Sequence, residues 1–588
     1  MHLSAGVDPV IGVRSKGDQA AAVEEFFELF KTPWEYYEPG RSYDVVIATA
    51  DDTREVEARL LLLYGAGNKS ADVRNGITVR SRHRGGSLDF QGIALPIYGD
   101  LSTFEEGGRG IPCLAATPGM AGVRIVSGRN KTVVRLGYDL FQEVQLLLSA
   151  GQPIEQAHMP TLDIHIGMLR SWILKEGIPL LEIPPAPGGH SFAVCLTHDI
   201  DFVGIRNHKF DHTMWGFLYR STVGAVRDLF RRRISTTRLF AIWRAAASLP
   251  FVYLGWAKDF WDPFEWYLRV EKNLPATYLL IPFKRRAGEH VPGGHASRRA
   301  TAYDVDDLQH RMAALQKESC ELGVHGIDSW HSVEKGRAEL ARIAEMTGES
   351  AIGIRMHWLL HDANTASILE ESGYAYDSTA GYNETIGYRN GTTQVFRPLG
   401  AKTLLELPLH IQDGALFYRQ RLDLSEAEAE KRCRDLIDNA GQFGGVLTVL
   451  WHDRSHAPER FWGDFYIWLV QSLRSSDAWF ATAGMVTSWF RKRRAVCFEP
   501  LGPANQVRIS NRYKGEGALP PLNLRVYRPS ANGNGATSTF MDIPWNAKSI
   551  VEFDSSLSKV SEIPVGLSAM EICPDEVCLH SGSKRIRP

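Results

Sequence analysis

The sequence predicts an α/β protein whose central region is a parallel sheet or barrel with helices outside it. Short apolar runs recur through the middle of the chain, and helical patterns lie between them. Glycine or a capping residue marks the ends of several of these helices. Repeated strand–helix units of this kind form parallel sheets, because a parallel neighbour is reached through a crossover helix.

Six apolar runs are predicted as strands, over 192–196, 277–281, 321–324, 351–354, 404–409 and 446–450. Helices are predicted between them from Ser332 to just before the possible C′ glycine Gly348, and from near position 364 to just before 373. A third helix has a capping box made by Ser425 and Glu428 and runs to Asn439.

The length of 588 residues predicts roughly three domains, since domains typically hold ~100–200 residues. A Pro- and Gly-rich segment at 184–189 marks the first boundary. We predict an N-terminal α/β domain over 1–186, a catalytic barrel over 187–497 with a helical insertion at about 212–270, and a small β-rich domain over 498–588. The turn-rich stretch 530–538 belongs to the third.

Composition narrows the class of protein. The chain has 66 Lys and Arg against 68 Asp and Glu, a net charge of -2, which argues against a nucleic-acid-binding protein. Its 7 Cys are odd in number and widely spread, which fits a reducing compartment. The start of the sequence has no apolar signal-peptide core, and no apolar run is long enough to span a bilayer. We therefore expect a cytoplasmic protein.

The first predicted strand ends in two carboxylates, Asp199 and Asp201. In an extended chain both lie on one face, and carboxylates held so close repel unless a cation or a shared proton lies between them. This pattern favours a metal and a base side by side, as in hydrolases. The alternative is an Asp pair that caps a helix.

Ionisable residues follow other predicted strands as well. The third strand ends in His325, the fourth in Arg355 and the sixth in His452. In a βα barrel the carboxyl ends of the strands converge on one face, where active sites are built. The sequence therefore predicts that these side chains meet Asp199 and Asp201.

From about Ser191 to Arg494 the chain resembles the polysaccharide deacetylase superfamily, also called the NodB-homology or carbohydrate esterase family four superfamily. Its members have a distorted (β/α) barrel and use a divalent metal to remove N- or O-acetyl groups from sugars. The resemblance rests on five segments in the family's order: Thr197-His198-Asp199-Ile200-Asp201, Gly323-Val324-His325, Gly353-Ile354-Arg355, Leu407-Pro408-Leu409 with Asp413, and Leu450-Trp451-His452.

The resemblance implies a role for each motif residue. Asp199 would be the catalytic base, Asp201 and His325 metal ligands, Arg355 the group that orients the base, and His452 the catalytic acid. The implied cofactor is a divalent metal, and we expect Zn²⁺. Further residues are expected to bind substrate, namely Trp451, His357 and Asp413.

One departure from the family concerns the third metal ligand. The family's two metal-binding His are usually four positions apart, but position 329 is Ser here, and the next His is His331. Either His331 loops back to the metal, or Asp328 replaces it, or the site is degenerate. His331 as an ordinary surface residue is the remaining reading.

The predicted function is metal-dependent removal of N- or O-acetyl groups from a carbohydrate. Because we expect a cytoplasmic protein, the predicted substrate is a lipid- or nucleotide-linked sugar. The alternatives are hydrolysis of a small non-sugar amide in the same barrel and a catalytically degenerate glycan-binding module.

An insertion over 215–266 combines aromatics with Arg231-Arg232-Arg233. It predicts either peripheral contact with a membrane or a helical hairpin packed over the barrel mouth, which we favour. The basic, Gly-rich segment 284–300 is expected to be a mobile loop, with a substrate lid as one role open to it.

Overall fold

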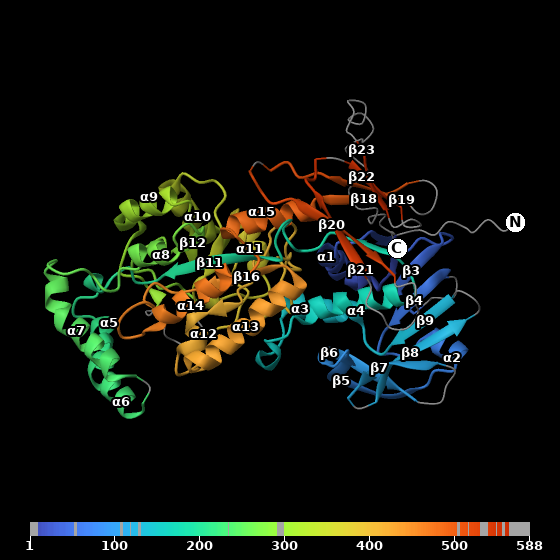
Figure 1. Ribbon diagram of the computed structural model, residues 1–588, viewed down its shortest axis with the longest axis horizontal. Helices are drawn as coiled ribbons and strands as arrows, with labels where there is room; N and C mark the ends of the chain where they lie inside the picture. Colours follow the sequence, from blue (N-terminus) through green and yellow to red (C-terminus); the bar gives the residue numbers. More distant parts are fainter. Residues whose placement is uncertain are drawn as a thin grey trace. The chain divides into compact units, whose positions relative to one another are not determined.

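The computed structural model describes residues 10–563 apart from 52–55, 106–109, 118, 128–130, 233, 291–298, 502–505, 516, 530–538, 549 and 555–558 (Figure 1). The chain forms two compact units, one of Met1–Gly151, Thr161–Gly189 and Trp489–Pro588, the other of Gln152–Pro160 and His190–Ser488. The turn-rich stretch 530–538 and part of the expected loop at 284–300 lie outside the described residues.

The first unit contains a nine-stranded sheet in the order β2-β1-β3-β4-β9-β8-β6-β5-β7. Strands β2, β1, β3, β4 and β9 are parallel, and the pairings from β9 to β7 are antiparallel. The strands are β1 (Ile11–Arg14), β2 (Trp34–Tyr36), β3 (Tyr43–Ala48), β4 (Ala58–Tyr64), β5 (Val79–Phe90), β6 (Ile93–Phe104), β7 (Ile111–Ala116), β8 (Met120–Ser127) and β9 (Lys131–Leu136). The helices are α1 (Ala20–Phe30), α2 (Ser70–Asn75), α3 (Leu140–Ser149) and α4 (Thr161–Lys175).

Segments from both ends of the chain meet in this unit. Strand β10 (Leu180–Glu182) pairs antiparallel with β20 (Leu522–Arg528), which pairs with β21 (Thr539–Trp545). A second antiparallel sheet has the order β18-β19-β22-β23, formed by β18 (Val496–Leu501), β19 (Gln506–Asn511), β22 (Ile550–Asp554) and β23 (Lys559–Ile563). The segments predicted as the domains 1–186 and 498–588 thus share one compact unit, because backbone pairing joins them.

The second unit is built on a seven-stranded parallel sheet with the order β14-β13-β12-β11-β16-β15, and β17 pairs with β11 as well. The strands are β11 (Phe192–Ile200), β12 (Ala276–Leu280), β13 (Glu321–Gly326), β14 (Ile354–Met356), β15 (Ile411–Gln412), β16 (Val446–Leu450) and β17 (Ala478–Phe480). The helices between and after them are α5 (His212–Tyr219), α6 (Ala225–Phe230), α7 (Thr236–Tyr253), α8 (Phe264–Val270), α9 (Gln309–Lys317), α10 (Val333–Thr347), α11 (Thr365–Ser372), α12 (Asp413–Phe417), α13 (Glu426–Phe443), α14 (Trp462–Arg474) and α15 (Ala483–Arg494).

Most of the predicted elements of this unit are present. Strand β16 has the predicted bounds, and α10 begins after the N-cap Ser332 and ends at Gly348 in the left-handed conformation. Ser425 and Glu428 form the predicted capping box, although α13 continues to Phe443. The predicted parallel arrangement of strands is confirmed within the described residues.

The predicted strand over 404–409 is wrong. Pro408 has no N–H to donate to a ladder, and this segment makes only isolated bridges, from Glu406 to Asp377 and Phe396. Asp377 in turn bridges to Ile354 of β14, and β15, which begins two residues after this segment, pairs with β16. Isolated bridges through Asp377 therefore link this segment to the β14 edge of the sheet, whereas the β15 edge is formed by regular pairing.

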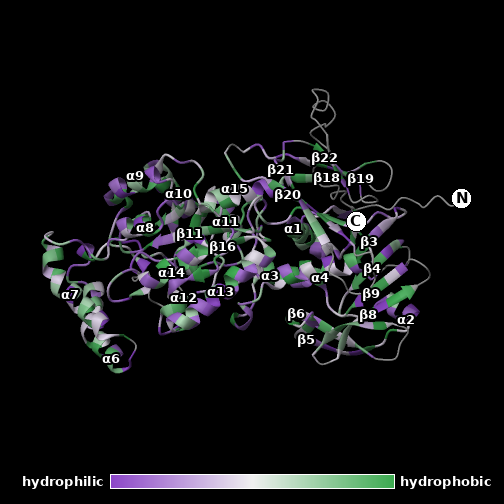
Figure 2. Cartoon of the chain, in the orientation of Figure 1, coloured by the Kyte–Doolittle hydropathy of each residue, from purple (hydrophilic) through white to green (hydrophobic). Residues whose placement is uncertain are grey.

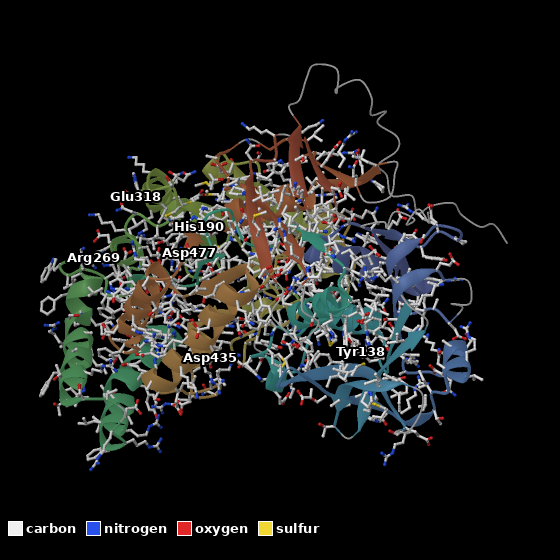
Figure 3. The ribbon with its side chains drawn as sticks, turned by 45° about the vertical axis from the view of Figure 1, so that its right-hand side comes forward. Tyr138, His190, Arg269, Glu318, Asp435 and Asp477 are labelled. Carbon is white, nitrogen blue, oxygen red and sulfur yellow. The ribbon has the colours of Figure 1, made fainter. Side chains whose placement is uncertain are left out.

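The two ends of the sheet differ in chemistry. The labelled residues His190 and Asp477 in Figure 3 lie 3.7 Å apart just before β11 and β17 begin, so they mark the amino ends of these parallel strands. The carboxyl ends carry Asp199, Arg355 and the other predicted site residues. No helix of the described part of the chain is both long enough and apolar enough to cross a membrane.

Candidate active site

The end of β11 presents its side chains alternately to two environments. Thr197 and Asp199 point to one side, where both contact Arg355. His198 points to the other side, where Nε2 lies 2.8 Å from Glu271 Oε1 and Nδ1 lies 2.9 Å from the carbonyl of Trp451. The strand period of two residues thus directs the carboxylate to the site and His198 into the interior.

Arg355 holds Asp199 in one orientation. Its Nη1 donates to Asp199 Oδ1 at 3.0 Å and to Thr197 Oγ1 at 2.8 Å. Its Nε and Nη2 donate to the carbonyl and hydroxyl oxygens of Ser378, both at 2.9 Å. The guanidinium is fully buried, so these bonds act in a low dielectric, where a charge-assisted hydrogen bond is strong. Asp199 Oδ2 remains directed toward His325 Nε2, 3.7 Å away.

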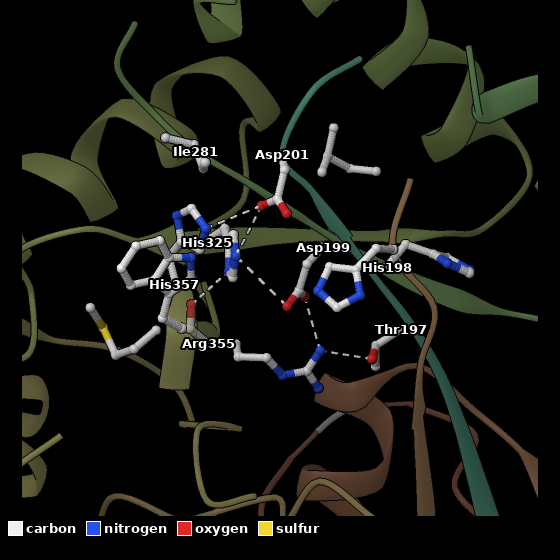
Figure 4. A network of polar contacts seen from close by, with 12 residues as sticks. Thr197, His198, Asp199, Asp201, Ile281, His325, Arg355 and His357 are labelled. Atoms are coloured by element: carbon white, nitrogen blue, oxygen red, sulfur yellow. Dashed lines mark hydrogen bonds and ion pairs between the residues drawn. The ribbon is translucent and has the colours of Figure 1, made fainter. Parts of the chain in front are cut away.

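A group of possible metal ligands lies beside this carboxylate (Figure 4). One ligand atom each of Asp201, His325 and His357 lies within 4.8 Å of the other two. Asp201 Oδ1 is 3.5 Å from His325 Nε2 and 3.6 Å from His357 Nε2. Ligand atoms at about 2.1 Å from a tetrahedral Zn²⁺ lie roughly 3.4 Å apart, so these separations fit such an ion.

The protonation of these side chains also fits a metal site. His325 Nδ1 lies 3.0 Å from the backbone oxygen of Arg355, to which it must donate, so Nε2 keeps a free lone pair. Burial lowers the pKa of His357 to about 3, which keeps that imidazole neutral, as a ligand must be. Burial opposes ionisation of Asp201, but electrostatic interaction with the neighbouring imidazoles of His357 and His325 outweighs it and lowers the pKa of Asp201. Asp201 Oδ1 is buried and has no hydrogen-bond partner among the described residues.

A second carboxylate–imidazole pair follows β16. Asp413 accepts hydrogen bonds from the backbone N–H of His452 at 2.8 Å and, through Oδ1, from His452 Nδ1 at 2.6 Å. Ser455 Oγ also donates to Asp413. Burial lowers the pKa of His452, but the charge of Asp413 and its hydrogen bond outweigh burial and raise that pKa to about 10. The charges of Asp201 and Asp199 add to this rise, so His452 lies within their electrostatic reach.

Asp453 organises the turn that follows Asp201. Its Oδ2 accepts hydrogen bonds from the backbone N–H groups of Phe202 at 2.6 Å and Val203 at 3.1 Å. Burial, reinforced by the charge of Asp201, raises the pKa of Asp453 to about 6. The segment that follows β16 therefore supplies His452 and also, through Asp453, holds the turn that follows β11.

The third member of the ligand group is His357, which the sequence predicts to bind substrate. The expected candidates His331 and Asp328 instead bind each other, with His331 Nε2 3.1 Å from Asp328 Oδ1. Asp328 also accepts the backbone N–H of Glu289. Position 329, where the family has its second His, is a buried Ser that donates to Glu339. The signal for His357 is its position two residues after Arg355, at the end of the neighbouring strand.

The other two expected substrate contacts lie in the interior. Trp451 and Asp413 are both 0% exposed. Trp451 stacks on Phe465 with ring centroids 5.9 Å apart, so it belongs to the core. Asp413 is occupied by His452 and Ser455. Neither side chain offers a surface to a substrate in this structure, and Asp413 instead positions His452.

No family model and no curated protein matches the chain. Similar solved structures include one named as a polysaccharide deacetylase from Mycobacterium smegmatis, at 19% identity and a TM-score of 0.31, which covers 53% of this chain and 95% of that one. Another, Agd3, is named as a novel carbohydrate deacetylase. It has 9% identity and a TM-score of 0.37, and the match covers 95% of this chain and 100% of that one. A family 4 acetyl xylan esterase from Clostridium thermocellum has 12% identity and a TM-score of 0.22, and the match covers 50% of this chain and 91% of that one. The resemblance of this chain to the polysaccharide deacetylase superfamily rests on its five sequence motifs.

Proposed function

We propose that the protein is a metal-dependent hydrolase that removes acetyl groups from a carbohydrate. The observation that carries the proposal is the position of Asp199. One of its oxygens is held by buried Arg355, and the other faces His325 of the ligand group. A carboxylate anchored in this way beside a metal site is suited to accept a proton from water, not to fill a structural ion pair.

The residues Asp201, His325 and His357 would hold the divalent metal. One carboxylate oxygen and two imidazole nitrogens form a donor set typical of catalytic zinc, which leaves positions open for water and substrate. A bound ion of this kind polarises a carbonyl group and lowers the pKa of water to about 7.

The chain's own residues would then move two protons. Asp199 Oδ2 takes one proton from the attacking water, whose oxygen bonds to the acyl carbon, while Arg355 keeps the carboxylate aimed. His452 donates the other proton to the leaving nitrogen or oxygen as the acyl bond breaks. Its Nδ1 is bound to Asp413, so Nε2 is the donor, and its raised pKa keeps the imidazolium populated at neutral pH.

The residues also bear on the alternatives. A degenerate glycan-binding module has no need for an anchored carboxylate, an imidazolium and three convergent ligands, and all of these are kept here. An amide of a small metabolite would use the same groups, so the carbohydrate is proposed from the resemblance of the motifs. A lipid- or nucleotide-linked sugar remains our proposal for its form.

Acetate release from N-acetylated and O-acetylated sugars, measured beside ammonia or acid release from small cyclic and linear amides, tests the proposal. We expect the acetylated sugars to be hydrolysed and Asp201→Asn to abolish turnover together with bound metal. Turnover of the small amides alone would replace the carbohydrate assignment, and no turnover of either class by metal-loaded protein would contradict the enzyme assignment.

A further inference from the structure

The helices inserted between β11 and β12 carry a large part of the exposed apolar surface of the molecule. Of the twenty exposed large hydrophobic side chains among the described residues, ten lie between Phe210 and Trp256. This segment forms α5, α6 and α7, which project at one end of the second unit in Figure 1. Concentrated exposed apolar surface of this kind marks an interaction site.

Helix α7 is apolar on two faces. Its inner face is already used: Leu239 and Ile242 pack with Ala225 of α6, and Leu249 and Val252 belong to a second buried cluster. Its outer face carries a second apolar stripe at helical spacing, formed by the exposed residues Phe240, Trp243, Phe251 and Leu254. A helix of a soluble domain needs only one apolar face, so the outer stripe is left without a partner in the described protein.

The preceding helices repeat this pattern. Met214 and Phe217 of α5 are buried in one cluster with Leu249 and Val252 of α7. Trp215, Tyr219 and Phe230 are exposed, Phe230 to 83%. Figure 2 shows hydrophobic residues interspersed with hydrophilic ones along α6 and α7. The exposed rings also gather in pairs, since the centroids of Phe240 and Trp243 lie 6.0 Å apart.

Positive charge accompanies these rings. Residues 212–256 contain seven Arg and one acidic residue, Asp228, a net charge of +6 in a chain whose total is -2. Asp228 is bound by Arg419. The exposed side chains of Arg231, Arg232 and Arg244 have no carboxylate partner among the described residues.

We propose that the aromatic–arginine surface, meaning the exposed side chains of α5, α6 and α7 together with Arg231 and Arg232 between α6 and α7, binds the surface of an anionic lipid membrane. Trp and Tyr favour the interface between headgroups and acyl chains, Phe and Leu favour the acyl region, and Arg attracts anionic headgroups. A second copy of the chain would bring two such positive surfaces together, so charge complementarity favours the bilayer. The surface would bind in the plane of the interface, as helices with an apolar face and a basic face do.

Co-sedimentation of the full chain with vesicles tests this surface separately from catalysis. We expect binding to phosphatidylcholine vesicles that contain phosphatidylglycerol, weaker binding to phosphatidylcholine alone, and loss of the difference at about 0.5 M salt. The double variant Phe230→Ser/Trp243→Ser should weaken binding about tenfold or more, because large apolar side chains no longer enter the bilayer. The matched control, Val73→Ser/Ile111→Ser, removes exposed apolar side chains of the first unit and should bind as the wild type does.

A second pair of variants isolates the charge. Arg231→Gln/Arg232→Gln should weaken binding to anionic vesicles and flatten its salt dependence, whereas Lys272→Gln/Lys317→Gln, exposed elsewhere on the second unit, should not. Far-UV circular dichroism and acetate release report whether each variant is folded. Absence of binding to anionic vesicles by the wild type, or equal binding by the surface variants and their controls, would overturn the proposal. The proposal would also be overturned if the wild type bound no vesicles but formed a dimer or bound single-stranded nucleic acid, and the aromatic substitutions abolished that association.

Discussion

Two carboxylate–cation pairs lie at the strand ends, and they are built in opposite ways. In the Asp199–Arg355 pair the cation is fully buried, and the second carboxylate oxygen faces the metal-ligand group. In the Asp413–His452 pair the carboxylate is fully buried, while the imidazole side chain is 24% exposed. Arg355 thus orients Asp199, and Asp413 orients His452. Under the proposed function, Asp199 and His452 are the members that transfer protons.

The largest effect is expected at Asp199. Asp199→Asn keeps the shape of the side chain but removes the base, and general-base catalysis is worth ~10²–10⁴-fold in rate. Acetate release should fall by that range while bound metal, measured by elemental analysis, stays at the wild-type level. Arg355→Lys, which loses the forked contact to Ser378, is the companion variant and should fall less. Loss of metal from Asp199→Asn would make Asp199 a ligand and undo the comparison.

The next effect separates His357 from His331. Since losing a partner of a ligand already weakens metal binding ~10–100-fold, loss of the ligand in His357→Ala should weaken it by more than about a hundredfold. His331→Ala should bind Zn²⁺ as the wild type does, because His331 is directed at Asp328. Isothermal titration of the metal-free proteins measures both. The reverse order of affinities would restore His331 as the third ligand.

Asp413→Asn tests the second pair through pH. Below about 10 the wild-type His452 is protonated, and the acid form is lost as the pH rises through that pKa. Without the Asp413 charge, only the charges of Asp201 and Asp199 oppose burial, so the pKa of His452 should fall to near its usual ~6.5 and the alkaline limb of kcat should move to lower pH. At pH 8 the rate should fall roughly thirtyfold, with recovery as the pH is lowered toward 5. An unshifted alkaline limb would show that Asp413 does not control His452.

The smallest effect concerns a carboxylate that belongs to neither pair. Ser425 accepts the backbone N–H of Glu428, and Glu428 accepts the backbone N–H of Ser425, at the start of α13. Ser425→Ala should lower the free energy of unfolding by about 1 kcal/mol, measured by urea denaturation. Metal content and acetate release should stay unchanged. A loss of activity here would mean that the site responds to general destabilisation, and the larger effects above would lose their specificity.

The sequence alone predicted the features that short-range patterns determine. Apolar runs located β11 and β16, capping residues located α10 and α13, and the alternation of a strand placed Asp199 and Asp201 together. Those patterns do not reveal which strand-end side chains turn inward. That depends on pairing between strands far apart in the chain.

His357 illustrates why sequence patterns alone do not identify the third metal ligand. It follows β14, whose parallel pairing with β13 brings His325 opposite Arg355 and so carries His357 to Asp201. The expectation for His331 comes from the family's second metal-binding His, whereas the contacts of Asp328 and Ser329 hold that turn elsewhere. The burial of Trp451 likewise depends on a helix that follows it in the chain, since it stacks on Phe465 of α14. Asp413 is held by His452 and Ser455, about forty residues away in the sequence.

The proposed function requires one metal ion, held by Asp201, His325 and His357 beside Asp199, for acetyl removal. Titration of the metal-free protein with Zn²⁺, with acetate release from an N-acetylated sugar measured at each step, tests this requirement. We predict that activity rises in proportion to bound zinc and levels off at about one ion per chain, as expected for a single site. Acetate release that persists in the metal-free protein, or zinc that binds to saturation without any acetate release, would contradict it.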